Sequence, residues 1–432
     1  MTRFPLLVVA ALAIAAPAHA DLNSDADAGA RKIEQKVIDW RRDIHSHPEL
    51  GNREFRTSAL VAKHLRALGM EVKTGVAHTG VVGILRGAKS EPTVALRADM
   101  DALPVTEQVD LPFASKVTTT WAGKKTGVMH ACGHDTHVAM LMGVAEILAG
   151  MRDRLKGTVV FIFQPAEEGP PPGEDGGAAM MVKEGVMSDP KVDAVFGLHI
   201  GSSMEVGKLG YRPGPTLAAA DILRITVTGK QTHGAAPWAG VDPVVVSAQI
   251  ILGLQTIVSR QVKITREPAV VSIGSINGGN RFNIIPDQVE MVGTIRTLDE
   301  DMRADIHERV RRTAINIAQA AGATAQVDIQ SPYSVMVNDP ALTERMLPTL
   351  RRVVGKDNVI LRDKSTGYED FADFAKQAPG LFVFLGGSTP GTDLSKVAYN
   401  HSPLFRIDES ALIIGVRTLT NLTLDYLDMN PR

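Results

Sequence analysis

The spacing of hydrophobic residues in the middle of the chain predicts one compact α+β domain. Apolar and polar residues first alternate as in half-buried strands and then recur at helical spacing, and this succession occurs twice. The resulting order of strand, helix, strand, strand, helix, strand is that of a ferredoxin-like sandwich. The expected elements are strands at 221–228, 269–276, 287–297 and 324–329 and helices at 242–260 and from Glu300 to about Ala321.

The segments on either side of this region predict a different architecture. Short apolar runs typical of buried strands alternate there with helix-like segments, which predicts a mostly parallel α/β/α fold. We therefore expect a catalytic domain split into residues 21–217 and 331–432 by an inserted domain at 218–330. Its strands are expected at 93–98, 158–163, 193–198 and 381–385, and its helices near 55–69, 134–150, 176–185, 340–354 and from about Asp408 to Leu427.

The first twenty residues predict a secretory signal peptide. A basic Arg3 precedes an apolar run from Leu6 to Ala16, and Ala18, His19 and Ala20 form an Ala-x-Ala cleavage pattern. A membrane anchor is the competing interpretation, but the run is shorter than the roughly 20 residues that span a bilayer. We expect cleavage near Ala20, no membrane anchor elsewhere, and an exported protein that is periplasmic or secreted.

Charge and cysteine content narrow the possible functions. Lys and Arg number 46 against 48 Asp and Glu, so no basic field favours nucleic acid as a partner. The single cysteine, Cys132, cannot form an intrachain disulfide even in an oxidising compartment. It is a small buried hydrophobe, an intermolecular crosslink, or a reactive or ligating group.

Potential metal ligands follow three of the predicted strands. In open α/β sheets, the loops at the carboxyl ends of parallel strands converge on one crevice. Strand 93–98 leads into two acids, strand 158–163 into two more, and strand 193–198 into a histidine. These residues are Asp99, Asp101, Glu167, Glu168 and His199.

The segment 129–137, MHACGHDTH, concentrates metal-binding side chains around one glycine. It contains a thiol, three imidazoles and a carboxylate, which are ligands for zinc and neighbouring transition metals. Any single histidine here could instead be a helix cap or a surface group, and Cys132 an inert core residue. The clustering, together with the carboxylates that follow the strands, favours a metal site.

The adjacent Glu167 and Glu168 allow two different roles. Side chains of neighbouring residues diverge, so one carboxylate can bind metal while the other takes a proton from water and later gives it to a leaving amine. A solvated acidic turn is the alternative for such a pair.

Eight motifs in order resemble the aminoacylase and carboxypeptidase metallopeptidases. The resemblance is to the branch that contains hippurate hydrolase, N-acyl-L-amino acid amidohydrolase and indole-acetyl-amino acid hydrolase, and it covers nearly the whole mature chain. The motifs are RRDIHSHPELG at 41–51, ALRADMDALPV at 95–105, MHACGHDTH at 129–137, FQPAEEG at 163–169, GLH at 197–199, THGAAP at 232–237, FNIIP at 282–286 and NHSP at 400–403.

This resemblance implies two divalent metal ions per subunit and assigns their ligands. Manganese and zinc are the leading candidates, and cobalt and nickel are possible. Glu167 is implied as general base, and Asp99 and Asp101 as groups that orient ligands, because Asp99 stands where much of the wider family has a ligand histidine. The implied metal ligands are Cys132, His134, Glu168, His199 and His401.

The resemblance also implies a homodimer formed through the inserted domain, which would serve as a lid. In this family the domain contributes a histidine to the neighbouring subunit's active site, and His233 matches it as a donor to the oxyanion of the tetrahedral intermediate. Asn283 and Arg281 match positions that bind the substrate's carboxylate. The GYED segment at 367–370 is expected to line the pocket.

The expected function is metal-dependent hydrolysis of the amide bond of N-acyl amino acids, such as hippurate-like conjugates, to a carboxylate and a free amino acid. Two alternatives remain. One is an exported metallo-dipeptidase or aminopeptidase with the same metal centre, and the other is a non-catalytic binding protein on the same fold.

Overall fold

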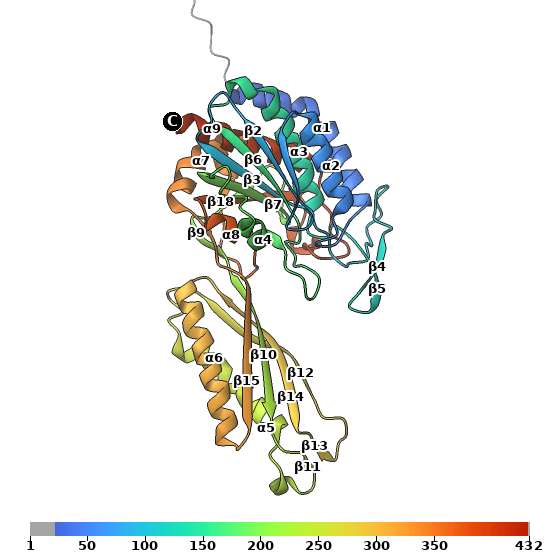
Figure 1. Cartoon of the computed structure of the whole chain (residues 1–432), viewed down its shortest axis with the longest axis vertical. Helices are drawn as coiled ribbons and strands as arrows, with labels where there is room; N and C mark the ends of the chain where they lie inside the picture. The colour runs from blue at the N-terminus through green and yellow to red at the C-terminus, as the bar shows by residue number, and fades with distance from the viewer. Residues whose placement is uncertain (1–21, 431–432) are drawn as a thin grey trace, which may run out of the picture.

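A computed structural model of the chain describes residues 22–430 and contains two units (Figure 1). A broad unit holds both ends of the described chain, and an elongated unit projects from it. The predicted signal peptide at 1–20 lies outside the described residues. Both units are mixtures of helices and strands, as the sequence predicts.

The broad unit is built on an eight-stranded sheet in the order β1-β2-β6-β3-β7-β18-β8-β17. Its four central strands, β6, β3, β7 and β18, run parallel to one another, whereas β2 and β8 pair antiparallel to them. The bounds are β1 Glu71–Val76, β2 Gly80–Arg86, β3 Thr93–Asp99, β6 Thr158–Gln164, β7 Ala194–Glu205, β8 Leu209–Tyr211, β17 Val359–Leu361 and β18 Gly380–Ser388.

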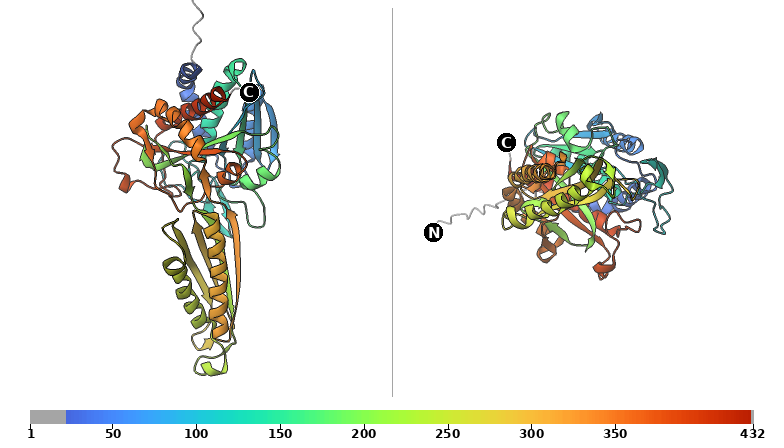
Figure 2. Two further views of the ribbon diagram at one scale, coloured as in Figure 1. Left: turned by 90° about the vertical axis from the view of Figure 1, so that its left-hand side faces the viewer. Right: turned by 90° about the horizontal axis from the view of Figure 1, so that it is seen from below.

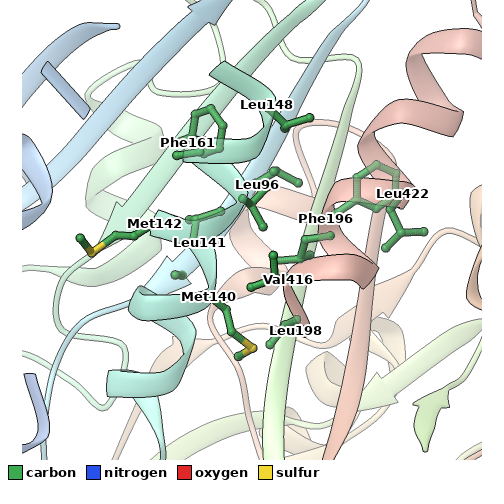
Figure 3. Close-up of a cluster of buried hydrophobic side chains, with 14 of the residues drawn as sticks. Leu96, Met140, Leu141, Met142, Leu148, Phe161, Phe196, Leu198, Val416 and Leu422 are labelled. Atoms are coloured by element: carbon green, nitrogen blue, oxygen red, sulfur yellow. The ribbon is translucent and has the colours of Figure 1, made fainter. Parts of the chain in front are cut away.

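Helices cover both faces of this sheet, so its central strands are mostly apolar. Every residue of β3 and β6 is buried, and alternate residues of these strands belong to two separate hydrophobic clusters. Figure 3 shows the first cluster, in which Leu141 and Val416 pack near Leu96 and Phe196. Helices α1 Leu22–Ser46, α2 Phe55–Ala67, α3 His134–Gly150, α7 Pro340–Val354 and α9 Ser410–Met429 supply that cluster, and α4 Gly177–Lys183 and α8 Phe371–Ala375 supply the second.

The elongated unit is an antiparallel four-stranded sheet with two helices on one face (Figure 2). The strand order β12-β14-β10-β15 is that of the ferredoxin-like sandwich predicted from the sequence, and the fold class is confirmed. That residues 218–330 form a separate inserted domain stays a prediction. The elements are β10 Ala219–Thr228, α5 Pro243–Thr256, β12 Ala269–Gly278, β14 Gln288–Thr297, α6 Glu300–Ala320 and β15 Thr324–Tyr333.

Helix α5 continues into a π-helical turn at Ile257–Gln261. By length and composition, Pro243–Gln261 is apolar enough to cross a membrane, so the expectation that no further segment meets this criterion is wrong. In the structure, α5 packs on the small sheet, and a third of this stretch is buried. Core helices of proteins without a membrane span pass the same test.

Several elements had no counterpart in the sequence prediction. Among them are the long first helix α1, the strands β1, β2, β8 and β17 that flank the four central strands, the hairpin β4 Thr118–Trp121 with β5 Lys124–Gly127, and the short strands β9 Gly214–Leu217 and β16 Met336–Asn338. Apart from the seven-residue β2, these strands have three to six residues, which is too few for a clear hydrophobic period.

Candidate metal centre

The candidate metal ligands converge at the carboxyl ends of the parallel strands. Asp99 ends β3, Glu167 and Glu168 follow β6, and His199 lies within β7. Cys132 and His134 flank the start of α3. Gly133 between them has φ 99°, and a Cβ there would lie 2.7 Å from Ile200, so only glycine fits this turn.

Cys132 lies at the centre of one group of ligands. Its Sγ is 3.2 Å from Nε2 of His199 and 3.3 Å from Nε2 of His401, and that same nitrogen of His401 is 3.0 Å from Oε1 of Glu168. His401 has φ 72°, an uncommon backbone conformation held by a hydrogen bond from its N–H to the carbonyl of Ala131. The loop therefore orients His401 toward the cluster at some conformational cost.

The hydrogen bonds of two histidines fix their tautomers, and each ring keeps a lone pair on Nε2 that faces the ligand cluster. Nδ1 of His199 lies 2.7 Å from the carbonyl of Ile200, and Nδ1 of His134 lies 2.8 Å from the carbonyl of Asp101. Each Nδ1 must therefore carry the proton and donate, which leaves Nε2 as an acceptor. Nε2 of His134 is buried without a hydrogen-bond partner among the described residues, as expected for a nitrogen that binds a cation.

The donor set fits a pair of divalent metal ions. Three overlapping groups of side chains have ligand atoms within 4.8 Å of one another: Cys132, His134 and His199; Cys132, Glu168 and His401; and His134, Glu167 and Glu168. Burial, and then the charges of Glu168 and Glu167, raise the pKa of the Cys132 thiol well above its usual range. A bound cation would remove that obstacle by holding the thiolate.

The two adjacent glutamates have opposite pKa shifts. Burial and then the nearby Glu369 and Glu168 raise the pKa of Glu167 well above its usual value. Burial also opposes ionisation of Glu168, but its hydrogen bond from His401 and the charge of His134 outweigh burial and lower its pKa. Glu168 is therefore suited to bind a metal ion as an ionised carboxylate, and Glu167 is suited to take up and release a proton.

Asp101 and Asp99 contact the predicted ligands without belonging to the predicted ligand set themselves. The Oδ2 of Asp101 accepts a 2.9 Å hydrogen bond from the backbone N–H of Glu168, and its Oδ1 lies 3.3 Å from Nδ1 of His134. Asp99 lies 3.7 Å from Nε2 of His134 and accepts a 2.6 Å hydrogen bond from Nδ1 of His137. Both positions suit the orienting role expected from the sequence.

Two residues important to this arrangement had no role in the sequence prediction. The Nε2 of His137 accepts a 2.9 Å hydrogen bond from the backbone N–H of Ile200, so His137 links Asp99 to the strand that carries His199. Arg97 is fully buried and contacts Asp99, Glu369 and Asp370. The dense MHACGHDTH motif could have drawn attention to His137, but Arg97 has no comparable signal in the sequence.

A cavity of about 520 Å³ opens beside the cluster, a size that suits a small-molecule ligand. Tyr368 and Glu369 of the GYED segment line it, as expected, together with two arginines, Arg296 and Arg362. A larger cavity of about 940 Å³ lies between residues 108–113 and 387–409. None of the clustered metal-ligating side chains borders the larger cavity, so we place the reaction in the smaller one.

The structure does not bring His233, Asn283 and Arg281 to the metal cluster of their own chain. His233 is in the short strand β11 Thr232–His233, which pairs with β13 Ile284–Ile285 at the far end of the elongated unit (Figure 1). His233 and Arg281 are exposed. The three residues therefore do not contribute to the metal site of their own chain in this structure.

The fold and this cluster define a hydrolase whose site is built for divalent metal ions. A sequence profile described as Peptidase family M20/M25/M40 matches residues 95–425, and the chain belongs to this family. This confirms the resemblance found in the sequence. The chain is accordingly a hydrolase that acts on amide bonds.

Similar proteins agree with this assignment. Thermostable carboxypeptidase 1 of Saccharolobus solfataricus is 44% identical over 387 residues, covering 89% of this chain and 94% of that protein. N-acetyl-L-cysteine deacetylase of Bacillus subtilis is 37% identical over 398 residues, covering 92% and 90%. The crystal structure of the Bacillus subtilis YXEP protein, described as a dinuclear metal binding peptidase from the M20 family, superposes with a TM-score of 0.78 at 35% identity, covering 93% and 100%.

Proposed function

We propose that this protein hydrolyses the amide bond of N-acyl amino acids with two divalent metal ions, manganese or zinc before cobalt or nickel. The observation that carries the proposal is the meeting of Cys132, His134, Glu168, His199 and His401 beside Glu167. The N-acetyl-L-cysteine deacetylase among its relatives is named for an N-acyl amino acid and supports this substrate class.

Hydrolysis converts R–CO–NH–R′ and water to R–COO⁻ and H₃N⁺–R′. Bound divalent ions would polarise the amide carbonyl and lower the pKa of a water molecule. Glu167 would take the proton from that water and pass it to the amide nitrogen as the C–N bond breaks. Glu167 is only 5% exposed, so its carboxylate is largely shielded from bulk solvent.

Arg296 is positioned to hold the carboxylate of the substrate's amino acid. It comes from β14 of the elongated unit, lines the cavity and has no carboxylate partner within residues 22–430. A guanidinium matches a carboxylate in shape and charge. Asn283 and Arg281 would add to this contact only from a second subunit.

A homodimer through the elongated unit is part of the proposal. The outward face of α5 exposes Val245 and Leu252, and the neighbouring edge strand β12 exposes Ile276. Exposed apolar side chains beside an unpaired strand edge are typical of a surface that a partner covers. In such a dimer His233 of one subunit would donate to the oxyanion in the other.

A carboxypeptidase activity is the second candidate. The relative named thermostable carboxypeptidase supports it, and the C-terminal residue of a peptide is itself an N-acyl amino acid. Hydrolysis of hippurate but not of free dipeptides would favour the amidohydrolase over a dipeptidase or aminopeptidase, because hippurate lacks the free amine of a dipeptide. We also propose export after cleavage near Ala20, which N-terminal sequencing of the mature protein would test.

The Glu167→Gln variant tests the mechanism. We expect kcat for a cleaved N-acyl amino acid to fall about 10²- to 10⁴-fold, the usual contribution of a general base, while two metal ions per subunit remain by elemental analysis. Glu308→Gln, on the exposed face of α6, is the matched control. Unchanged turnover in Glu167→Gln would refute the assigned role, and no cleavage of any N-acyl amino acid by metal-loaded enzyme would refute the function.

A further inference from the structure

Two arginines of the reaction cavity lack an acidic partner. Nε of Arg296 donates to the hydroxyl of Thr294, and its guanidinium lies 5.1 Å from the ring centre of Tyr368. The guanidinium of Arg362 lies 4.1 Å from the ring centre of Phe384. Neither arginine makes an ion pair within the described part of the chain, and one substrate carboxylate needs only one of them.

Arg362 is the more unusual of the two. Its side chain is partly buried and makes no hydrogen bond with residues 22–430, and burial lowers its pKa. Shielding a guanidinium even partly from water without giving it a hydrogen-bonding partner is unfavourable. The buried Arg97 and Arg303, by contrast, each contact at least two carboxylates.

The surroundings hold Arg362 at the reaction cavity. Its backbone N–H bonds to the carbonyl of Tyr211, which fixes the loop after β17. Phe384, beneath the guanidinium, is the direct neighbour of the metal-cluster residue His199 across the β18–β7 pair. Asp363 borders the same cavity but lies outside ion-pair distance, so the cationic group remains available.

From this geometry we infer that Arg362 determines substrate specificity by binding a second carboxylate, so that the preferred substrates are N-acyl amino acids with two carboxylates. The inference rests on the proposed function and refines it. Arg296 takes the α-carboxylate beside Tyr368, and Arg362 takes the additional carboxylate above Phe384. That second group belongs either to the amino acid side chain or to the acyl chain.

Matched substrate pairs test this inference. N-acetyl-L-glutamate against N-acetyl-L-glutamine places the extra charge on the amino acid, and N-succinyl-L-alanine against N-butyryl-L-alanine places it on the acyl chain. We expect the wild-type enzyme to prefer the charged member of at least one pair about tenfold or more in kcat/KM. Arg362→Met should lower that preference roughly 10- to 100-fold, since charge-assisted hydrogen bonds have this effect.

Two further variants separate recognition from stability. Arg362→Lys keeps the charge and should retain part of the preference, while Arg351→Met, on the exposed face of α7, should leave the ratio unchanged. Equal losses on charged and neutral substrates in Arg362→Met, or no charge preference in the wild type, would overturn the inference while leaving the amidohydrolase function intact. If the wild type cleaves no N-acyl amino acid, both this inference and the proposed function are wrong.

Discussion

Both units of this protein contain a buried arginine among acidic side chains, and the charges around Arg97 in one unit and Arg303 in the other differ. In the broad unit, Arg97 contacts Asp99, Glu369 and Asp370, and Glu167 of the metal cluster lies next to Glu369 and Asp370. Here carboxylates outnumber the one permanent cation. Burial, only partly offset by Arg97, raises the pKa of Asp370 to about 8, so this group resists full ionisation.

In the elongated unit, the charges around the buried arginine are nearly balanced. Asp221 accepts hydrogen bonds from Arg303 at 2.6 Å and lies 2.7 Å from Nε2 of His307, and Glu300 contacts the outer edge of Arg303. Hydrogen bonds from these partners outweigh burial and lower the pKa of Asp221.

The difference separates a structural network from a functional one. A balanced network such as that of Asp221 is complete in the folded chain. An excess of buried carboxylates must either take up protons or be joined by cations, and a metal centre provides such cations. The four predictions below address this distinction, in order of decreasing effect.

Removing the cations should abolish activity. Treatment with a chelator should reduce the hydrolysis rate to background, and re-addition of manganese or zinc should restore it. Cys132→Ser should weaken metal binding by more than the 10- to 100-fold typical of losing a group that only supports a ligand. Activity that persists in the chelated protein, with metal absent by elemental analysis, would contradict the metal centre.

Breaking the balanced network should affect stability instead. Asp221→Asn leaves Arg303 buried without its main partner, and we expect the free energy of unfolding to fall by about 3–5 kcal/mol. Urea denaturation measures this loss. Asp328→Asn, at an exposed position of β15, is the control and should change stability by less than about 0.5 kcal/mol. If Asp221→Asn lost metal but kept its stability, the network of Asp221 would be functional rather than structural, which would contradict this prediction.

The far end of the elongated unit should matter for catalysis only across subunits. His233→Ala should lower kcat about 10²- to 10³-fold, the usual effect of losing an oxyanion donor, with metal content and stability retained. Co-expression of His233→Ala with Glu167→Gln should restore activity, because mixed dimers contain one intact site. If mixed dimers form and stay inactive, His233 does not act in the partner's site.

The smallest expected effect is on the pH dependence of the free energy of unfolding. Because the pKa of Asp221 in the folded protein lies below its usual value of 3.8, the ionised carboxylate stabilises the fold above that pH. This contribution is lost as the pH falls through the folded-state pKa. The stability difference between wild type and Asp221→Asn should therefore be full at pH 7 and shrink below about pH 4. A difference that is independent of pH down to pH 2 would exclude this linkage.

Much of the fold could be predicted because its central elements have strong hydrophobic periods. The predicted strand 158–163 is β6 at Thr158–Gln164, and the predicted helix 134–150 is α3 at His134–Gly150. Helix α1 was not predicted, although Val37 and Ile44 are buried, because charged residues interrupt its apolar face.

The candidate site was predictable for a different reason. Cysteine, histidine and carboxylate side chains at strand ends are chemically distinctive, and the parallel topology requires that such ends meet. His401 was named from family resemblance alone, because a histidine before Ser-Pro has no local feature that marks it. Only the folded chain places its Nε2 beside Cys132.

The sequence by itself determined the four central strands of the large sheet, the four strands of the small sheet and the types of side chain available for metal binding, because hydrophobic period and side-chain chemistry are local properties. Tertiary structure decided which charges are balanced and which are not. Three features depend on distances between residues far apart in the chain. They are the acidic partners of Arg97, the tautomer of His134, and the lack of an acidic partner for Arg362 within the described residues. Such distances exist only after the sheet has formed and water has been excluded from around it.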